Sequence, residues 1–293
     1  MRRLIVNADD FGLTPGVNKA VIELHQAGAL TSTTLMASGA SFQEAVELAK
    51  QNASLGVGCH IVLVDSMPIS PPGTIATLLD PDSHAPAFRS TLGRFVQDLF
   101  LGHIDTHHIQ IEAAAQIRRL QGSGLTVTHI DTHKHTHMFP RVLEPVLRAA
   151  LACGVRRVRT PYEPQWSVRA TPGASTARRL QVQLLRTMRQ TFLTCARDYG
   201  MIPTNGCLGV LATGTLDATT IQAILGHMPQ GAWELVCHPG YVDTELHATR
   251  TRLVASRATE IQALQAVLSN AAAKFPDIAR IHFGDLLPAS TNI

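Results

Sequence analysis

The sequence predicts an α/β protein folded as a (β/α) TIM-like barrel, irregular in places, in which residues 1–293 form a single domain. Three observations favour this fold. Strand-like apolar runs alternate with helix-like stretches along the whole chain, which is typical of parallel strands joined by helical crossovers. Roughly eight such units fit the length of a barrel better than that of an open sheet. A doubly wound sheet is the second choice, because no Gly-x-Gly-x-x-Gly motif follows a strand.

The first expected strand, 4–8, is rich in β-branched residues and is followed by Gly12 and Pro15. In chain order, further strands are expected at 32–37, 56–63, 126–131, 155–160, 207–212, 234–238 and 280–283. The main helices are expected at 15–27, 41–51, 112–120, 140–153, 216–225 and 253–274.

Two segments interrupt this alternation. Residues 65–87 are rich in Pro, Ser and Asp and predict a long loop over the mouth of the barrel. Residues 161–204 predict a surface insertion with an Arg-rich amphipathic stretch, 178–189. A solvated helix is the preferred interpretation of that stretch, and contact with a membrane or a lipid substrate is the alternative.

The composition excludes several classes of protein. The chain is 45% hydrophobic and 16% charged, with a net charge of +3, as in ordinary globular proteins. It has no basic stripe interleaved with aromatic residues, so we expect no nucleic-acid partner. No apolar run is long enough to span a membrane. The apolar start ends in Asp9 and Asp10 without a cleavage site, so we expect a cytoplasmic protein.

Reactive side chains gather where the expected strands end, which is where parallel barrels carry their sites. Asp9 and Asp10 end the first strand, and two buried carboxylates there call for a cation or a proton. The other strand ends carry His60, the run from His129 to His137, Arg159 and His238. The sequence therefore predicts a metal ligand and a general base at one site.

Histidine alternates with other residues after the fourth expected strand. Residues 129, 131, 133, 135 and 137 share one parity, so an extended chain would place four His and one Asp on one face, typical of a metal-ligand surface. For His135 and His137, hydrogen bonding is favoured over metal binding. The similar run 103–107 begins a helical pattern with Asp105 and Thr106 as N-caps, so we exclude it, as we exclude His282.

The five cysteines are widely spaced and contain no Cys-x-x-Cys motif. This argues against a disulfide framework and against a zinc ribbon. Cys59 and Cys237 each neighbour a candidate histidine, but alternation turns them to the opposite face of their strands. We expect both to be small buried residues and not nucleophiles.

These motifs together resemble the YdjC-like carbohydrate deacetylase family. The residues that carry the resemblance are 7–12, 30–36, 56–60, 128–140 and 238–240, so it covers most of the chain up to about residue 245. The Asp-Asp-Phe-Gly start together with the Asp-x-His-x-His-x-His run is highly specific. The branch associated with hopanoid biosynthesis is the most similar, judged from Arg159-Thr160-Pro161 and the Arg-rich insertion.

The resemblance implies a barrel that holds one divalent metal and removes the acetyl group from an N-acetylated amino sugar. It implies Asp10, His60 and His133 as metal ligands. It further implies Asp9 as the general base, His238 as the general acid and Arg159 as the residue that orients the base. Zinc is the first expectation for the metal, with Mg, Mn, Co, Ni and Fe as alternatives.

Other functions stay open at this stage. A non-catalytic sugar- or lipid-binding protein with a relict metal site would have lost the base or the acid, yet Asp9 and His238 are both present. A metal phosphoesterase usually has more carboxylate ligands than these strand ends offer. The substrate is left open between a chitobiose-like sugar and a glycosylated hopanoid lipid, as are a homodimer and a peripheral contact with the inner membrane face.

Overall fold

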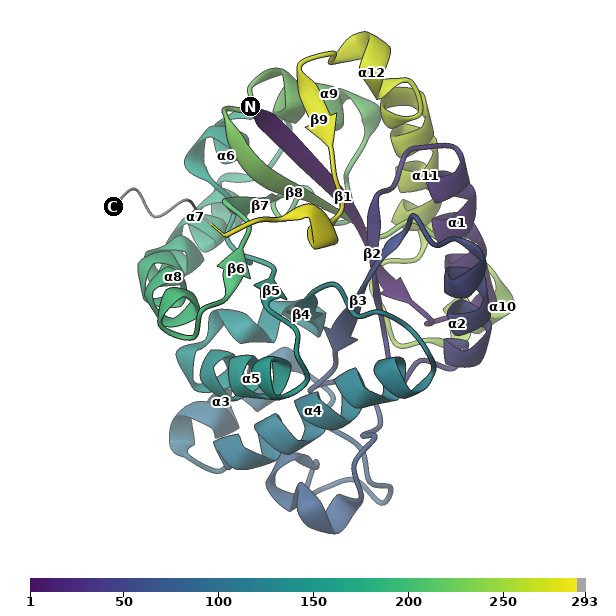
Figure 1. Cartoon of the computed structure of the whole chain (residues 1–293). Helices are drawn as coiled ribbons and strands as arrows, with labels where there is room; N and C mark the ends of the chain where they lie inside the picture. The colour runs from purple at the N-terminus through teal and green to yellow at the C-terminus, as the bar shows by residue number, and fades with distance from the viewer. Residues whose placement is uncertain (289–293) are drawn as a thin grey trace.

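Parallel strands form the centre of the computed structural model, which describes residues 1–288 (Figure 1). The strands are β1 (Arg2–Phe11), β2 (Ser32–Leu35), β3 (Gly56–Ile61), β4 (Ile130–Thr132), β5 (Arg157–Val158), β6 (Ile202–Pro203), β7 (Gly206–Leu208), β8 (Gly231–Cys237) and β9 (Ile278–Arg280). They pair in the order β6-β5-β4-β3-β2-β1-β8-β7, and β9 lies along the start of β1. All these pairings are parallel, as helical crossovers require.

The two ends of the sheet meet within one short stretch of chain, because β6 pairs with β5 and β7 pairs with β8. The backbone N–H of Cys207 also donates a hydrogen bond of 3.2 Å to the carbonyl oxygen of Tyr162, just after β5. The sheet therefore curls round and nearly closes. The predicted TIM-like barrel is confirmed, and the strand expected at 207–212 is the shorter β7.

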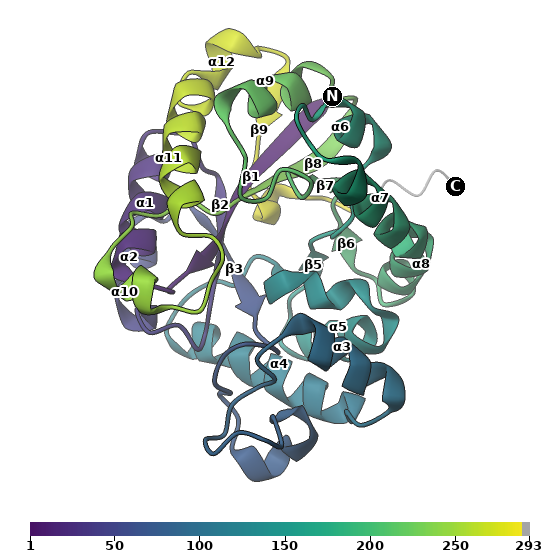
Figure 2. The ribbon, with the colours of Figure 1, turned by 180° about the vertical axis from the view of Figure 1, so that it is seen from behind.

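Helices surround the strands on the outside (Figures 1 and 2). They are α1 (Pro15–Gln26), α2 (Phe42–Gln51), α3 (Leu92–Leu101), α4 (Thr106–Gly122), α5 (Pro140–Ala152), α6 (Gln165–Ala170), α7 (Thr176–Leu185), α8 (Arg189–Asp198), α9 (Ala218–Gly226), α10 (Thr244–Ala248), α11 (Ala255–Leu268) and α12 (Ala271–Lys274). The single helix expected at 253–274 is thus two helices, and neither α3 nor β6 was predicted. Short 3₁₀ segments are η1 (Pro72–Thr74), η2 (Ala76–Leu78), η3 (His133–Met138), η4 (Arg186–Met188) and η5 (Phe283–Asp285).

Alternation along β1 separates the two sides of the barrel wall. Leu4, Val6 and Ala8 belong to the large apolar core between the strands and the helices. Ile5 packs instead in a small cluster with Ala232, Phe283 and Leu286. Asn7 and Asp9 share the parity of Ile5 and are also buried. The interior therefore has an apolar floor under a polar layer at the carboxyl ends of the strands.

The 65–87 loop lies mainly beside the barrel, against α4. Glu112 accepts hydrogen bonds of 2.9 Å from the backbone N–H groups of Ile69 and Ser70 and so fixes the loop to this helix. Its first residue, Asp65, accepts a hydrogen bond of 2.9 Å from Lys134, just after β4. A long loop is present as predicted, but most of it packs against α4 and not over the mouth of the barrel. Only the end at Asp65 reaches the residues that follow the strands.

The Arg-rich stretch is part of the helical insertion α6–α8, and its arginines are not simply solvated. Arg178 donates hydrogen bonds to the carbonyl oxygens of Leu211 and Val210, at 2.8 and 3.1 Å. Arg179 donates to the carbonyl oxygen of Thr171 at 2.6 Å. The interpretation as a solvated helix was therefore wrong for these two side chains, which tie α7 to neighbouring loops.

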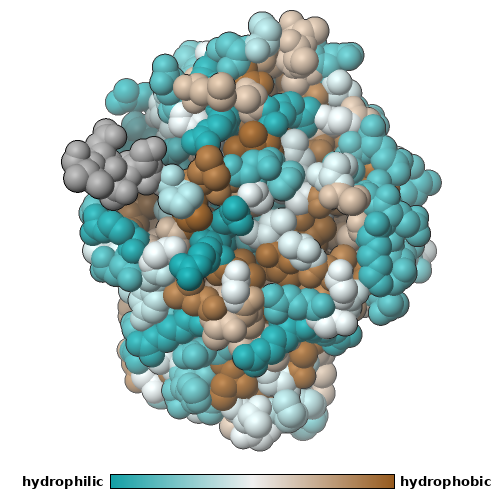
Figure 3. All heavy atoms as spheres, viewed as in Figure 1, coloured by the Kyte–Doolittle hydropathy of each residue, from teal (hydrophilic) through white to brown (hydrophobic). Residues whose placement is uncertain are grey.

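The outer surface mixes polar and apolar residues. On the face shown in Figure 3, hydrophilic residues dominate the right-hand edge over α1 and α2. Within residues 1–288, none of the helices combines the length and the apolar character needed to cross a membrane.

Candidate active site

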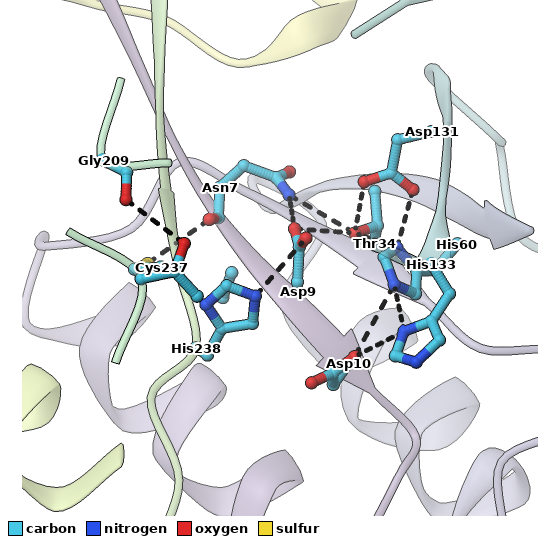
Figure 4. Close-up of polar contacts among 12 residues, drawn as sticks. Asn7, Asp9, Asp10, Thr34, His60, Asp131, His133, Gly209, Cys237 and His238 are labelled. Atoms are coloured by element: carbon cyan, nitrogen blue, oxygen red, sulfur yellow. Dashed lines mark hydrogen bonds and ion pairs between the residues drawn. The ribbon is translucent and has the colours of Figure 1, made fainter. Parts of the chain in front are cut away.

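The carboxyl ends of the strands bring the predicted site residues together (Figure 4). Asp9 and Asp10 come from β1 and His60 from β3, while His133 follows β4 and His238 follows β8. In Figure 4, Asp9 lies between His238 on one side and the two other histidines on the other. The structure thus brings these strand ends close together, while the roles of the residues stay predictions.

Asp10, His60 and His133 form a compact trio. The Asp10 Oδ1 atom lies 3.6 Å from both His60 Nε2 and His133 Nδ1, and the two nitrogens are 3.2 Å apart. A tetrahedral ion with bonds of about 2.0–2.1 Å would have ligand atoms roughly 3.3–3.4 Å apart. The separations fit one divalent ion, and two imidazoles with one carboxylate are a suitable donor set.

Asp131 fixes the orientation of His60. The His60 Nδ1 atom lies 2.8 Å from Asp131 Oδ1, and because a carboxylate can only accept, Nδ1 carries the proton. Nε2 is then the ring nitrogen that faces the trio, an orientation that carboxylates behind metal-binding histidines commonly impose. Burial lowers the pKa of His60, but Asp131, Asp9 and Asp10 outweigh it and raise the pKa to about 9. The carboxylates around His60 therefore favour a positive charge at this position, whether a proton or a metal ion.

Asp9 is held on both of its oxygens. Arg159 donates bidentate hydrogen bonds of 2.8 and 2.6 Å to Oδ2 and Oδ1, and Asn7 Nδ2 donates to Oδ1 at 3.0 Å. Burial raises the pKa of Asp9, but the Arg159 guanidinium, followed by His60 and His238, holds it well below its ordinary value. His238 Nε2 lies 3.8 Å from Asp9 Oδ2. Asp9 is therefore an ionised carboxylate beside an imidazole.

Arg159 is shared by three buried carboxylates. Besides Asp9, it contacts Asp131 at 2.5 Å and Glu234 at 2.6 Å. One guanidinium cannot neutralise three carboxylates, and their mutual repulsion favours protonation of one of them. Burial raises the pKa of Glu234 to about 7 although Arg159 opposes the change. Glu234 lies inside a strand-like apolar run in the sequence, and this position is the signal that could have identified it.

Two further residues reach the site from α11. Arg257 donates a hydrogen bond of 2.6 Å to Asp10 Oδ2, and Glu260 accepts one of 2.6 Å from the backbone N–H of His238. Sequence reasoning missed both. Their signal is helical spacing, because Arg257 and Glu260 fall on the same inward stripe of α11 as Ile261 and Leu264.

The one-face prediction for the histidine run was wrong beyond His133. The extended strand ends at Thr132, and Lys134 and His135 then adopt left-handed backbone, with φ of 55° and 52°. His137 instead bonds within the scaffold, at 2.7 Å from Thr132 Oγ1 and 3.1 Å from the Arg159 carbonyl oxygen. His129 is buried, and its ring stacks on that of Phe283 at 3.7 Å.

The residues excluded from the site lie elsewhere. The Asp105 side chain caps α4 by accepting from the backbone N–H of His107, and His282 caps η5. Cys59 and Cys237 are fully buried, and burial raises the pKa of each thiol well above its ordinary value. Both cysteines are therefore protonated core residues, as expected.

Comparisons with known proteins identify relatives of this chain. The family described as YdjC-like protein matches residues 3–274 of the chain. A carbohydrate deacetylase of Thermoanaerobacter pseudethanolicus is 30% identical over 246 residues, which cover 84% of each protein. A chitooligosaccharide deacetylase of Salmonella paratyphi C is 30% identical over 276 residues, covering 92% of this chain and 94% of that protein.

Solved structures share the fold. An Enterococcus faecalis V583 protein, provisionally described as a cellobiose-phosphate cleavage protein, superposes with a TM-score of 0.75 at 25% identity, covering 96% of this chain and 97% of that one. The lactam utilization protein of Thermus thermophilus has a TM-score of 0.52 at 13% identity, covering 95% and 99%. The second likeness concerns the fold alone.

Proposed function

Because the chain belongs to the YdjC-like protein family and is a carbohydrate N-deacetylase, we propose that it hydrolyses the acetamide of an N-acetylated amino sugar with one divalent metal ion. The observation that carries the proposal is the difference in surroundings between the adjacent aspartates Asp9 and Asp10. Asp10 turns one oxygen toward His60 and His133, while Asp9 lies beside His238 with both of its oxygens bound by Arg159. Metal-assisted amide hydrolysis uses two such groups, one that holds the ion and one that accepts a proton from water.

The metal would be held by Asp10, His60 and His133. When bound there, it would polarise the acetyl carbonyl and lower the pKa of the attacking water. Zinc is the first candidate, because two imidazoles and a carboxylate with open positions are typical of catalytic zinc sites, and Mg, Mn, Co, Ni and Fe are alternatives. Asp131 keeps the Nε2 lone pair of His60 directed at this position.

Asp9 and His238 would move the protons. Asp9 accepts a proton from the attacking water, and Arg159 keeps the carboxylate ionised and oriented until then. Burial lowers the pKa of His238 despite Asp9 and Asp10 nearby, so the resting imidazole is neutral at pH 7. His238 therefore acquires its proton within the site, and Asp9 at 3.8 Å is the donor. Passing that proton to the amine as the C–N bond breaks yields acetate and a free amino sugar.

A chitooligosaccharide-type substrate is the first candidate. Relatives that this chain matches over 92% of its length are named chitooligosaccharide deacetylases. The lipid-linked alternative loses part of its basis, since Arg178 and Arg179 bind backbone carbonyls. What favours it is a pair of exposed apolar residues on α7, Leu180 and Leu184, with 62% and 70% of their surfaces accessible. The cytoplasmic location, the homodimer and the membrane contact stay predictions from the sequence.

Acetate release tests the proposal. Purified protein, stripped with a chelator and reloaded with Zn²⁺ or Mn²⁺, is assayed on N-acetylglucosamine, its β-1,4-linked disaccharide and a lipid-linked N-acetylglucosaminide. We expect metal-dependent acetate release from the disaccharide. His60→Ala should lose both the metal and activity, whereas the matched control His25→Ala, on the outer helix α1, should lose neither. Metal-loaded wild type that releases no acetate from any of the three would refute the proposed function and favour a non-catalytic binding protein.

A further inference from the structure

Helix α11 reaches the site from outside the barrel wall. It lies beside α1 in both views of the ribbon (Figures 1 and 2). Its inward stripe is apolar toward its end, with Leu264, Val267 and Leu268, but its first turns present Arg257 and Glu260 instead. Both are almost fully buried, at 0% and 1% exposure. Charged groups at such positions are costly unless partners satisfy them, so their contacts indicate what they do.

Arg257 is bound to one oxygen of Asp10. Its guanidinium donates to Oδ2 at 2.6 Å, and its Nε donates to the Leu253 carbonyl oxygen at 2.8 Å. Asp10 has left-handed backbone, with φ of 67°, a conformation that non-glycine residues adopt only when their surroundings enforce it. With Oδ2 occupied by Arg257, Oδ1 is the oxygen left facing His60 and His133. The arginine thus decides which carboxylate oxygen is available.

The same turn of α11 grips the peptide of His238. Glu260 Oε2 accepts from the His238 N–H at 2.6 Å, and Arg257 Nη1 lies 3.5 Å from the His238 carbonyl oxygen. Two residues further on, a Cβ on Gly240 would come within 2.9 Å of Arg257 Cδ. The chain after β8 therefore follows a path that leaves room for this arginine, and both ends of the His238 residue are held by one helix turn.

We propose that Arg257 and Glu260 are positioning residues, with Arg257 setting Asp10 for the metal and Glu260 setting His238 for proton transfer. The inference rests on the proposed function for its chemistry. If the two residues were purely structural, replacing either one would lower stability alone. If they are positioning residues, replacing Arg257 should weaken metal binding and replacing Glu260 should lower turnover.

Metal titration of the stripped protein with Mn²⁺ or Zn²⁺ alone, followed by calorimetry, tests Arg257. We expect Arg257→Met to raise the metal dissociation constant about 10–100-fold, as the loss of a hydrogen-bond partner behind a metal ligand does, and Arg257→Lys to raise it less. Arg280→Met is the matched control, because Arg280 is a partly buried arginine that donates hydrogen bonds to the backbone carbonyls of Ala29 and Leu268. It should lose stability with an unchanged dissociation constant.

Turnover tests Glu260. Glu260→Gln keeps an acceptor oxygen for the His238 N–H and should retain kcat within about 3-fold, whereas Glu260→Met should lower kcat about 10-fold or more without changing KM or metal affinity. Folded Arg257→Met and Arg257→Lys with wild-type dissociation constants would overturn the Arg257 part. Equal kcat in Glu260→Met and wild type would overturn the Glu260 part. Acetate release by the wild type tests the proposed function on its own. The ratios of metal dissociation constants are measured without substrate and do not depend on that result.

Discussion

The two adjacent aspartates at the end of β1 are each paired with a buried arginine, but in different ways. Arg159 belongs to the end of a strand, binds both oxygens of Asp9 and also contacts Asp131 and Glu234. Arg257 belongs to an outer helix and binds one oxygen of Asp10. The same side chain at neighbouring positions thus acquires different chemistry, depending on how many of its lone pairs the scaffold occupies.

The difference in occupancy explains which aspartate suits a metal. On Asp9, Arg159 binds both oxygens, and Asn7 and Thr34 also approach Oδ1, at 3.0 and 3.3 Å. On Asp10, Oδ2 is bound and Oδ1 faces two imidazole nitrogens at 3.6 Å. A carboxylate saturated by hydrogen bonds is rigid and ionised, whereas one with a free oxygen can coordinate. We call the pairs Asp9–Arg159 and Asp10–Arg257 the Asp9 arm and the Asp10 arm. We therefore expect substitutions in the two arms to affect metal binding, turnover and stability differently.

The sharpest contrast is expected from the aspartates themselves. Asp9→Asn should keep the metal and lower kcat by about 10²–10⁴-fold, because it removes the proposed acceptor of the water proton. Asp10→Asn should instead lose the metal, since it removes the charge of a proposed ligand together with its ion pair to Arg257. Metal content by plasma emission spectrometry and acetate release are measured on the same samples. Loss of metal from Asp9→Asn, or full activity in it, would contradict the division of roles.

Replacing the arginine of each arm should lower the free energy of unfolding by different amounts. Arg159→Met leaves three buried carboxylates without their cation, and breaking such a buried network costs about 3–5 kcal/mol. Arg257→Met leaves one carboxylate without its cation and should cost less. Urea unfolding monitored by circular dichroism, with metal removed by a chelator, gives both values. Equal losses would show that the number of carboxylates around Arg159 has no energetic weight.

This asymmetry also marks the limit of what the sequence could predict. The ends of apolar runs pointed to Asp9, Asp10, His60, Arg159, His238 and the histidine run 129–137, because polar residues at the ends of barrel strands converge by topology. The choice of His133 within that run, and the role of each residue, came from the family resemblance. Arg257 and Glu260 were missed because a helix interior carries no motif, and only their helical spacing reveals an inward direction. The one-face prediction failed at Lys134 and His135, whose left-handed backbone is rare in residues other than glycine and ends the alternation of side chains.

Stability should depend on pH through the Asp9 arm. Burial raises the pKa of Glu234 from 4.5 to about 7, despite the opposing effect of Arg159. The folded state therefore binds a proton that the unfolded chain releases, so this stabilisation is full below pH 4.5 and is lost as the pH rises through about 7. The gap corresponds to about 3 kcal/mol at most. Urea unfolding of wild type and Glu234→Gln from about pH 5 to about pH 8 measures it.

The expected signature is a wild-type stability that falls relative to Glu234→Gln across that range. Glu47→Gln is the control, because Glu47 is exposed on α2 and should leave the wild-type curve unchanged. Parallel curves for wild type and Glu234→Gln would mean that Glu234 is ionised throughout. Arg159 would then balance three negative charges, and the protonated member of the Asp9 arm would have to be sought elsewhere.

A small perturbation of the Asp10 arm should come from Gly240. The added Cβ of Gly240→Ala would meet Arg257 Cδ at 2.9 Å and Val17 Cγ2 at 3.0 Å, so either the guanidinium or α1 has to move. Overpacking of this kind typically costs about 1–3 kcal/mol. If the guanidinium moves, Asp10 Oδ2 loses its partner and metal affinity falls, while Asp9 stays bound to Arg159.

Calorimetric metal titration and urea unfolding of Gly240→Ala distinguish the two responses. Weaker metal binding shows that the position of Arg257 controls Asp10, because Gly240 itself contacts no residue of the metal trio among the atoms nearest its Cβ. Gly226→Ala, on α9 with open space around its Cβ, is the matched control: it should leave metal affinity unchanged and raise stability by at most about 1 kcal/mol, because Ala favours the helix. If Gly240→Ala is less stable but binds the metal with unchanged affinity, α1 has moved and the Arg257 guanidinium has kept its position. Helix α11 would then hold Asp10 through Arg257 as rigidly as Arg159, after β5, holds Asp9.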